Sequence, residues 1–152
     1  MDKRTEISTA MKEALKNKDK IALATIRLIM AALKDRDIAE RENGQADGVS
    51  DAMILLMLQS MVKQRQESSK TYSEAGRDDL AEREETEIDV IRTFMPKQLS
   101  DDEVSEIIDG IIADLGADSI KDMGKIMGVL RADYAGQVDM GKAGGVTKVK
   151  LA

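Results

Sequence analysis

The chain has 152 residues, of which 34% are charged, and 29 acids against 23 bases give it a net charge of −6. It contains no cysteine and no histidine, which excludes disulfides, thiol nucleophiles and thiolate metal sites and removes the usual general base. With three aromatic residues and one proline, the core must be aliphatic residues and methionine, and the composition predicts an all-α fold. No catalytic residue, cofactor or metal is expected.

The first half of the sequence is predicted to form a helical bundle. Apolar residues at helical spacing predict a short helix over 5–16, and a turn at 17–19 leads into a second helix. That helix is apolar on most of its circumference over 21–33, which is typical of a central helix in a bundle. Its one charge there, Arg27, is expected to reach solvent along its own stem or to pair with an acid of the fourth helix.

Two further long helices are expected after the polar loop at 43–48. Ser50 is a good N-cap for the third, which ends at Gly76. Asp78 or Asp79 would cap the fourth, whose run of acids over 82–87 is expected to face solvent. Methionines recur every fourth residue in the third helix, which indicates either the bundle interior or an apolar surface for a partner protein. They are Met53, Met57 and Met61.

Pro96, the only proline, separates two kinds of sequence. The helical pattern extends to Met95 and resumes at Asp101. A proline inside a helix costs roughly 3 kcal/mol and displaces the preceding residue from helical geometry, so the pattern predicts a break. We therefore expect two domains, residues 1–95 and 96–152, with Pro96 as the joint between them or, secondarily, as a hinge.

The second domain is expected to hold three short helices. Ser100 and Glu103 form a capping box at the start of the first, and Gly116 ends it. A turn at 135–137 precedes the last helix, which starts near Asp139. The apolar stripes include Leu115, Ile120 and Val149. Three glycines in the last helix each cost up to ~1 kcal/mol relative to alanine. They are Gly141, Gly144 and Gly145.

Charge is divided unevenly within the second domain. Residues 100–118 carry seven acids and no base, whereas residues 119–152 carry six bases and three acids. A basic face is what contact with phosphate needs, and Lys121 and Lys125 would share a helix face, one turn apart. The alternative is that the bases are solvated or pair with the acidic helix. The six bases are Lys121, Lys125, Arg131, Lys142, Lys148 and Lys150.

Gly124 and Gly128 lie four residues apart in the second helix of this domain. One interpretation is close helix–helix approach. The other is backbone approach to a ligand or an RNA phosphate, because glycine removes the side chain that would block it. Few aromatic residues lie nearby, so base stacking is expected to contribute little.

Three separated motifs resemble the YqeY-like family. The first is Asn17-Lys18-Asp19-Lys20, followed by Ile26-Arg27. The second occupies 75–100 and includes Phe94-Met95-Pro96-Lys97-Gln98-Leu99-Ser100. The third is Asp122-Met123-Gly124-Lys125-Ile126-Met127-Gly128. The resemblance covers essentially the whole chain, and the order of the motifs makes it specific.

The family is similar in its C-terminal half to the tail domain of the B subunit of the tRNA-dependent aspartyl/glutamyl amidotransferase, where that domain contacts tRNA. The resemblance implies a bundle followed by a tail-like domain, with tRNA or the translation machinery as partner. Kinship with the amidotransferase also suggests the activity of a carbon–nitrogen ligase with glutamine as amido-N-donor. The resemblance supplies no catalytic residue for that activity. A protein-interaction adaptor that docks by apolar helix faces is the alternative.

The surroundings of the protein are expected to be aqueous. The longest apolar stretch, 21–33, is too short for a bilayer, which needs ~20 residues. No signal-peptide pattern opens the sequence. We therefore expect a cytoplasmic protein with no membrane partner.

Overall fold

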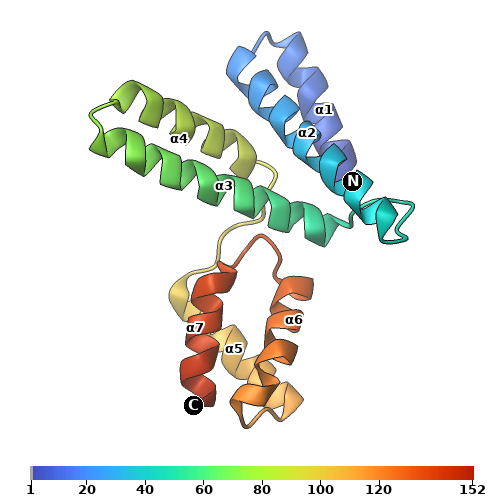
Figure 1. The fold of residues 1–152 in the computed structure, drawn as a ribbon, viewed down its shortest axis with the longest axis vertical. Coiled ribbons are helices and arrows are strands. Elements are labelled where there is room, and N and C mark those ends of the chain that lie inside the picture. Colours follow the sequence, from blue (N-terminus) through green and yellow to red (C-terminus); the bar gives the residue numbers. More distant parts are fainter. Residues whose placement is uncertain (1) are drawn as a thin grey trace. The chain divides into compact units, whose positions relative to one another are not determined.

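The structure, a computed structural model, describes residues 2–152. Those residues form seven α-helices and one 3₁₀ turn, with no strand among them (Figure 1), which confirms the all-α prediction. Contacts divide the chain into two compact units at Met95 and Pro96. We call them the N-terminal unit and the C-terminal unit and describe each by itself.

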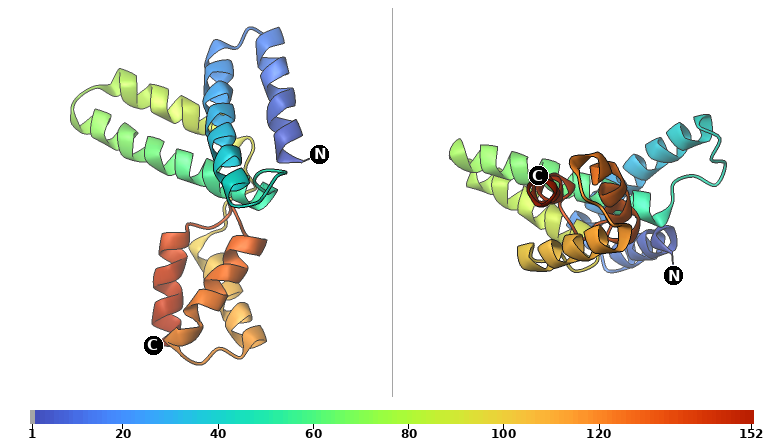
Figure 2. Two further views of the ribbon diagram at one scale, coloured as in Figure 1. Left: turned by 45° about the vertical axis from the view of Figure 1, so that its right-hand side comes forward. Right: turned by 90° about the horizontal axis from the view of Figure 1, so that it is seen from below.

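The N-terminal unit consists of two helical hairpins, α1–α2 and α3–α4 (Figures 1 and 2). Its helices are α1 (Lys3–Lys16), α2 (Lys20–Glu42), α3 (Asp51–Glu74) and α4 (Asp78–Arg92). With 14 residues in α1 and 15 in α4, this unit has two long helices and two shorter ones, where the sequence predicted three long ones. The difference arises because α4 ends three residues before Met95.

Of the two helix caps predicted in this unit, one is confirmed and one is wrong. The Ser50 hydroxyl accepts a hydrogen bond from the Met53 backbone N–H, as expected of an N-cap. The prediction for α4 is wrong, because the cap position is Arg77 and no side chain caps the helix. The Asp79 carboxylate instead accepts two hydrogen bonds from the Arg77 guanidinium, each 3.2 Å long. Asp78 and Asp79 both lie in the first turn, where the helix dipole favours negative charge.

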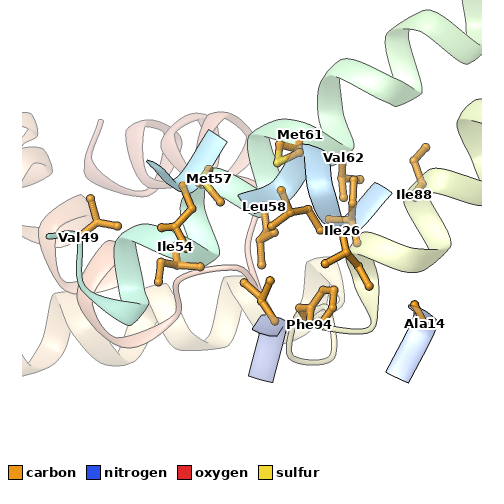
Figure 3. Packing of buried hydrophobic residues seen from close by; sticks show 14 residues of the cluster. Ala14, Ile26, Val49, Ile54, Met57, Leu58, Met61, Val62, Ile88 and Phe94 are labelled. Carbon is orange, nitrogen blue, oxygen red and sulfur yellow. The ribbon is translucent and has the colours of Figure 1, made fainter. Parts of the chain in front are cut away.

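The core of the N-terminal unit is a single cluster of buried aliphatic residues, methionines and one phenylalanine. Figure 3 shows Leu58 of α3 beside Ile26 of α2 and Phe94, which follows α4. Met57 is 1% exposed and Met61 8%, so the methionine repeat faces the interior of the unit rather than a partner. Each fully buried aliphatic side chain stabilises the fold by about 1.5–3 kcal/mol.

The second helix is less enclosed than its sequence predicted. Thr25, Ile26 and Ile29 are buried, but Ile21 is 55% exposed and Leu28 47%. α2 contacts α1, α3 and α4 along part of its circumference only, because the two hairpins meet over one side of it. The prediction of a central helix is therefore wrong for the residues opposite that side.

A charged network closes the N-terminal unit where α2 connects to α3. The Arg4 guanidinium donates to the two Asp37 carboxylate oxygens at 2.7 and 2.5 Å and to the Val49 carbonyl at 3.1 Å. The Val49 N–H donates to Asp37 at 3.0 Å. The hydrogen bond from Arg4 holds the pKa of Asp37 below its ordinary value. Gly48, with φ of +84°, brings the backbone into this network.

The predicted break at Pro96 is confirmed, but it starts earlier in the chain. α4 ends at Arg92, and the N–H groups of Thr93 and Phe94 bond to carbonyls three residues back, at 3.2 and 3.1 Å. Pro96 then lies in an irregular stretch that ends at Ser100. Its role as a hinge stays a prediction.

The C-terminal unit has three helices and a 3₁₀ turn. They are α5 (Asp101–Leu115), the 3₁₀ turn (Ile120–Asp122), α6 (Met123–Asp133) and α7 (Met140–Leu151). The capping box is confirmed: the Ser100 hydroxyl accepts from the Glu103 N–H at 3.1 Å, and the Glu103 carboxylate accepts from the Ser100 N–H at 3.2 Å. Gly116 ends α5 in the left-handed conformation, with φ of +62°.

Gly144 is the glycine of α7 that lies nearest to α6. A Cβ at Gly144 would lie 3.5 Å from the Met123 methyl group and 4.0 Å from that of Met127. These are ordinary contact distances, so an alanine would fit at this position and the low helix propensity of glycine is not offset by packing there. The inward placement predicted for three apolar residues is wrong, since all are exposed at element ends or along a groove. These are Leu115 (46%), Ile120 (49%) and Val149 (76%).

No helix in the described part of the chain combines the length and the apolar character needed to cross a membrane.

Candidate nucleic-acid interface

The two sides of α6 differ sharply in composition. Ile126 and Leu130 are fully buried and Met127 is 6% exposed, so this side forms part of the C-terminal core. The opposite side is exposed and carries two glycines, one alanine and two bases. Its residues are Gly124, Lys125, Gly128, Arg131 and Ala132.

The exposed side contains a strip of helix with no side chains. A Cβ built at Gly124 or at Gly128 meets no heavy atom within 4 Å. Close helix–helix approach, the structural interpretation of this pair, is therefore wrong, because no helix of the unit packs there. The backbone of α6 is open to solvent at Gly124 and Gly128, so an outside group can approach it.

Two of the predicted bases border this glycine strip, and a third precedes it in the 3₁₀ turn. At 100° per residue, Gly124 and Gly128 lie between Lys125 and Arg131 on the helix surface. Lys121 is exposed too but lies in the 3₁₀ turn before α6, so the prediction that it shares a regular α-helical face with Lys125 is wrong in detail. Within the described residues, no carboxylate lies within 4 Å of any of these three bases.

The three bases of α7 do not lie on the exposed side of α6. The Lys150 ammonium bonds to Asp109 of α5 at 2.7 Å, which is the pairing with the acidic helix that the sequence left open. Lys142 and Lys150 both line a groove between α7 and the start of α5. Lys148 is exposed. The structure thus brings Lys121, Lys125 and Arg131 to the α6 side and does not gather all six bases in one cluster.

A groove lies beside α7 that the sequence did not predict. Its volume is about 690 Å³, and its walls are mainly apolar, with Asp101 and Lys142 on the rim. Gly145 opens it, because no side chain projects there, and Val149 is exposed along it. The only signal in the sequence was the spacing of Val146 and Val149 behind Gly145, which also fits an inward stripe. Its apolar lining residues are Leu99, Val104, Val138, Ala143, Val146 and Val149.

The acids of α4 differ in how far they are exposed. Glu87 accepts from Arg65 of α3 at 3.0 Å, and its side chain is only 15% exposed, so the prediction that this run faces solvent is wrong for Glu87. Burial and the neighbouring Glu87 charge raise the pKa of Glu84. No three acidic side chains in residues 2–152 are arranged to hold a metal ion.

Arg27 takes the first of its two predicted roles. It is exposed on α2, and among the described residues it makes no ion pair with an acid of α4. The structure therefore leaves its charge in solvent, on the same helix as the exposed Ile21 and Leu28.

The fold and these surfaces define a class of protein: an all-α chain of two helical units, with a bare basic helix side in the second. The family described as Yqey-like protein matches residues 4–151, and the chain belongs to this family.

Several fungal proteins are similar to the chain. Three of them are named altered inheritance of mitochondria protein 41, mitochondrial. The protein from Clavispora lusitaniae is 28% identical over 134 residues, which is 86% of this chain and 75% of the relative. The one from Candida glabrata is 33% identical over 87 residues, 56% of this chain and 45% of the relative. The one from Lachancea thermotolerans is 25% identical over 95 residues, 62% and 49%. The chain spans about half the length of the last two.

Proposed function

We propose that the protein is a non-catalytic helical module that binds tRNA through the exposed side of α6. The observation that carries the proposal is the glycine strip of Gly124 and Gly128, bordered by two bases and preceded by a third, all without carboxylate partners. The similarity of the family to a tRNA-contacting tail domain supports tRNA as the nucleic acid.

The exposed side of α6 is chemically better suited to contact with a phosphate backbone than with nucleobases. Without side chains at Gly124 and Gly128, a sugar–phosphate chain can lie against the helix while Lys125 and Arg131 reach it from both sides. Each neutralised phosphate releases counterions, so three contacts give a slope of roughly −2 to −3 in log affinity against log salt. The net charge of −6 opposes nonspecific binding elsewhere on the protein.

A filter-binding titration with deacylated tRNA at low and physiological salt tests the proposal. We expect Lys121→Ala with Lys125→Ala to weaken binding about tenfold at low salt, because two of three phosphate contacts are lost. The matched control is Lys12→Ala with Lys63→Ala, which makes the same charge change at exposed positions of the N-terminal unit. Absence of tRNA binding, or equal affinities for both double variants, would reject it.

The label of carbon–nitrogen ligase with glutamine as amido-N-donor is not supported by this sequence, which has no cysteine, no histidine and no recognisable Ser–Lys amidase pattern. We infer that any such activity belongs to a partner. Glutaminase activity of the purified protein alone, abolished by one substitution, would reverse this inference.

The sequence predicts a cytoplasmic protein. The named relatives are mitochondrial proteins of fungi, so the mitochondrion is the alternative. Cell fractionation of the source organism separates the two.

A further inference from the structure

A second exposed surface lies on α2, in the N-terminal unit. Ile21 and Leu28 are exposed, as noted above, and so is Ile38, at 47%. Together with the exposed Ala24 and Ala31 they make five apolar residues that follow alternating steps of three and four as far as Ala31. The next position of the pattern is Asp35, an exposed acid, and Ile38 follows it. We call these five residues the α2 stripe. At 1.5 Å per residue it extends about 25 Å, or nearly five helical turns.

A row of bases follows the α2 stripe along one edge. The four bases are seven residues apart, so they lie almost on one line of the helix. All are exposed, and among residues 2–152 no carboxylate lies within 4 Å of any of them. They are Lys20, Arg27, Lys34 and Arg41.

Residues of the α2 stripe line two grooves. Ile21 and Ala24 form one wall of a groove of about 470 Å³, and its α4 wall carries three acids and Arg83. Ala31 and Lys34 line a groove of about 390 Å³ beside α1. The groove beside α1 gives the side chains of an incoming helix somewhere to insert, whereas the acids of the first groove would repel acidic groups.

We propose that the α2 stripe and its basic row form a docking site for an acidic amphipathic helix of another protein. The apolar spacing of three and four is the spacing of a helix–helix seam, and residues at its edge choose the partner by charge. Four unpaired bases on one edge therefore select a helix with acids at the matching positions. This site is separate from the proposed tRNA surface on α6.

A second copy of the chain does not fit this site. Two α2 helices paired antiparallel would place their basic rows against each other, and like charges across such a seam are destabilising. The acidic helix of this chain, α5, does not fit either. It buries Ile108 and Ile111 and exposes Glu106, Asp109 and Gly110, so it lacks a free apolar face.

RNA is the other macromolecule that four bases could attract. It would leave the α2 stripe in water, since three large aliphatic side chains offer nothing to phosphates or sugars. A protein helix covers the apolar residues and neutralises the bases together, which is why the observations favour it.

The test uses the full chain and a synthetic peptide of three heptads, with leucine at the seam positions and glutamate on both flanks. Its flanking glutamates keep the peptide from pairing with itself. Titration followed by fluorescence anisotropy is expected to give saturable binding in the micromolar range. The same peptide with lysine flanks is expected to bind at least about tenfold more weakly.

Variants of the chain locate the binding. Arg27→Glu with Lys34→Glu is expected to weaken peptide binding about tenfold or more, and Leu28→Lys to abolish it. The matched control is Lys12→Glu with Arg36→Glu, which makes the same charge change at exposed residues outside the basic row. Circular dichroism checks that each variant remains folded, since all these positions are exposed.

Three results would overturn the proposal. The first is no peptide binding at about 100 µM, a weak limit for a specific site. The second is tRNA affinity that falls with Arg27→Glu and Lys34→Glu while peptide affinity does not, which would assign the row to phosphate. The third is a concentration-dependent dimer in sedimentation that Leu28→Lys dissolves, which would assign the α2 stripe to a second copy.

Discussion

The environment of some single residues is set by tertiary packing and cannot be predicted from the local sequence pattern. Gly48 reads as an ordinary loop glycine, but a Cβ there would collide with the Asp37 carboxylate and lie 2.8 Å from the Arg4 guanidinium. Nothing in the sequence indicates that α1, α2 and the loop before α3 meet at this point, because Arg4 and Asp37 are 33 positions apart.

Gly48→Ala is therefore expected to destabilise the N-terminal unit by about 2–3 kcal/mol. It strains a backbone with φ of +84° and displaces the Arg4–Asp37 pair. The measurement is the free energy of unfolding in urea. Gly44→Ala is the matched control, because Gly44 also has positive φ, of +90°, but nothing within 4 Å. Equal losses in the two variants would show that the pair at Asp37 adds nothing to backbone strain.

At the scale of elements, helix starts were the most predictable feature. Ser50 and the Ser100–Glu103 box act locally, through hydrogen bonds within one turn, so spacing alone identifies them. The enclosure of α2 and the inward placement of Val149 were mispredicted because they depend on which helix lies opposite, and a single sequence does not encode that locally. The prediction of close helix–helix approach at Gly124 and Gly128 was wrong for the same reason.

Ser100→Ala is expected to cost about 1 kcal/mol of stability, since it removes the cap of α5. The hydrogen bonds of Ser100 lower the pKa of Glu103 in the folded state. Because the folded pKa lies below the unfolded one, the Glu103 contribution is present above the unfolded pKa and disappears as pH falls through the folded pKa.

Thermal unfolding at pH 7 and at pH 3 measures this pH dependence. Glu103→Gln should lower the melting temperature at pH 7 and change it little at pH 3. The matched control is Glu106→Gln, at an exposed position further along α5. A loss of equal size at both pH values would contradict the assignment to the charged form of Glu103.

At the scale of the whole molecule, each compact unit carries its own buried cluster and its own exposed surface of interest. The N-terminal unit offers the α2 stripe, and the C-terminal unit offers the bare side of α6. The sequence indicated the break at Pro96 and the basic character of residues 119–152. It could not indicate which bases share a side, because Lys150 pairs with Asp109 only in the folded unit.

We propose that the glycine strip of α6 is kept bare for RNA, at a cost in helix stability. Substituting Gly124→Gln with Gly128→Gln adds side chains into open space and leaves the charge unchanged. The variant should be more stable by roughly 0.5 kcal/mol per residue, because glutamine has the higher helix propensity.

The decisive measurement is tRNA affinity of this variant beside its melting temperature. Gly110→Gln on α5 is the control, since Gly110 also has nothing within 4 Å. We expect both variants to melt at a higher temperature, whereas only the α6 variant loses tRNA affinity, by about tenfold or more. A more stable α6 variant that binds tRNA as tightly as the unaltered protein would contradict it.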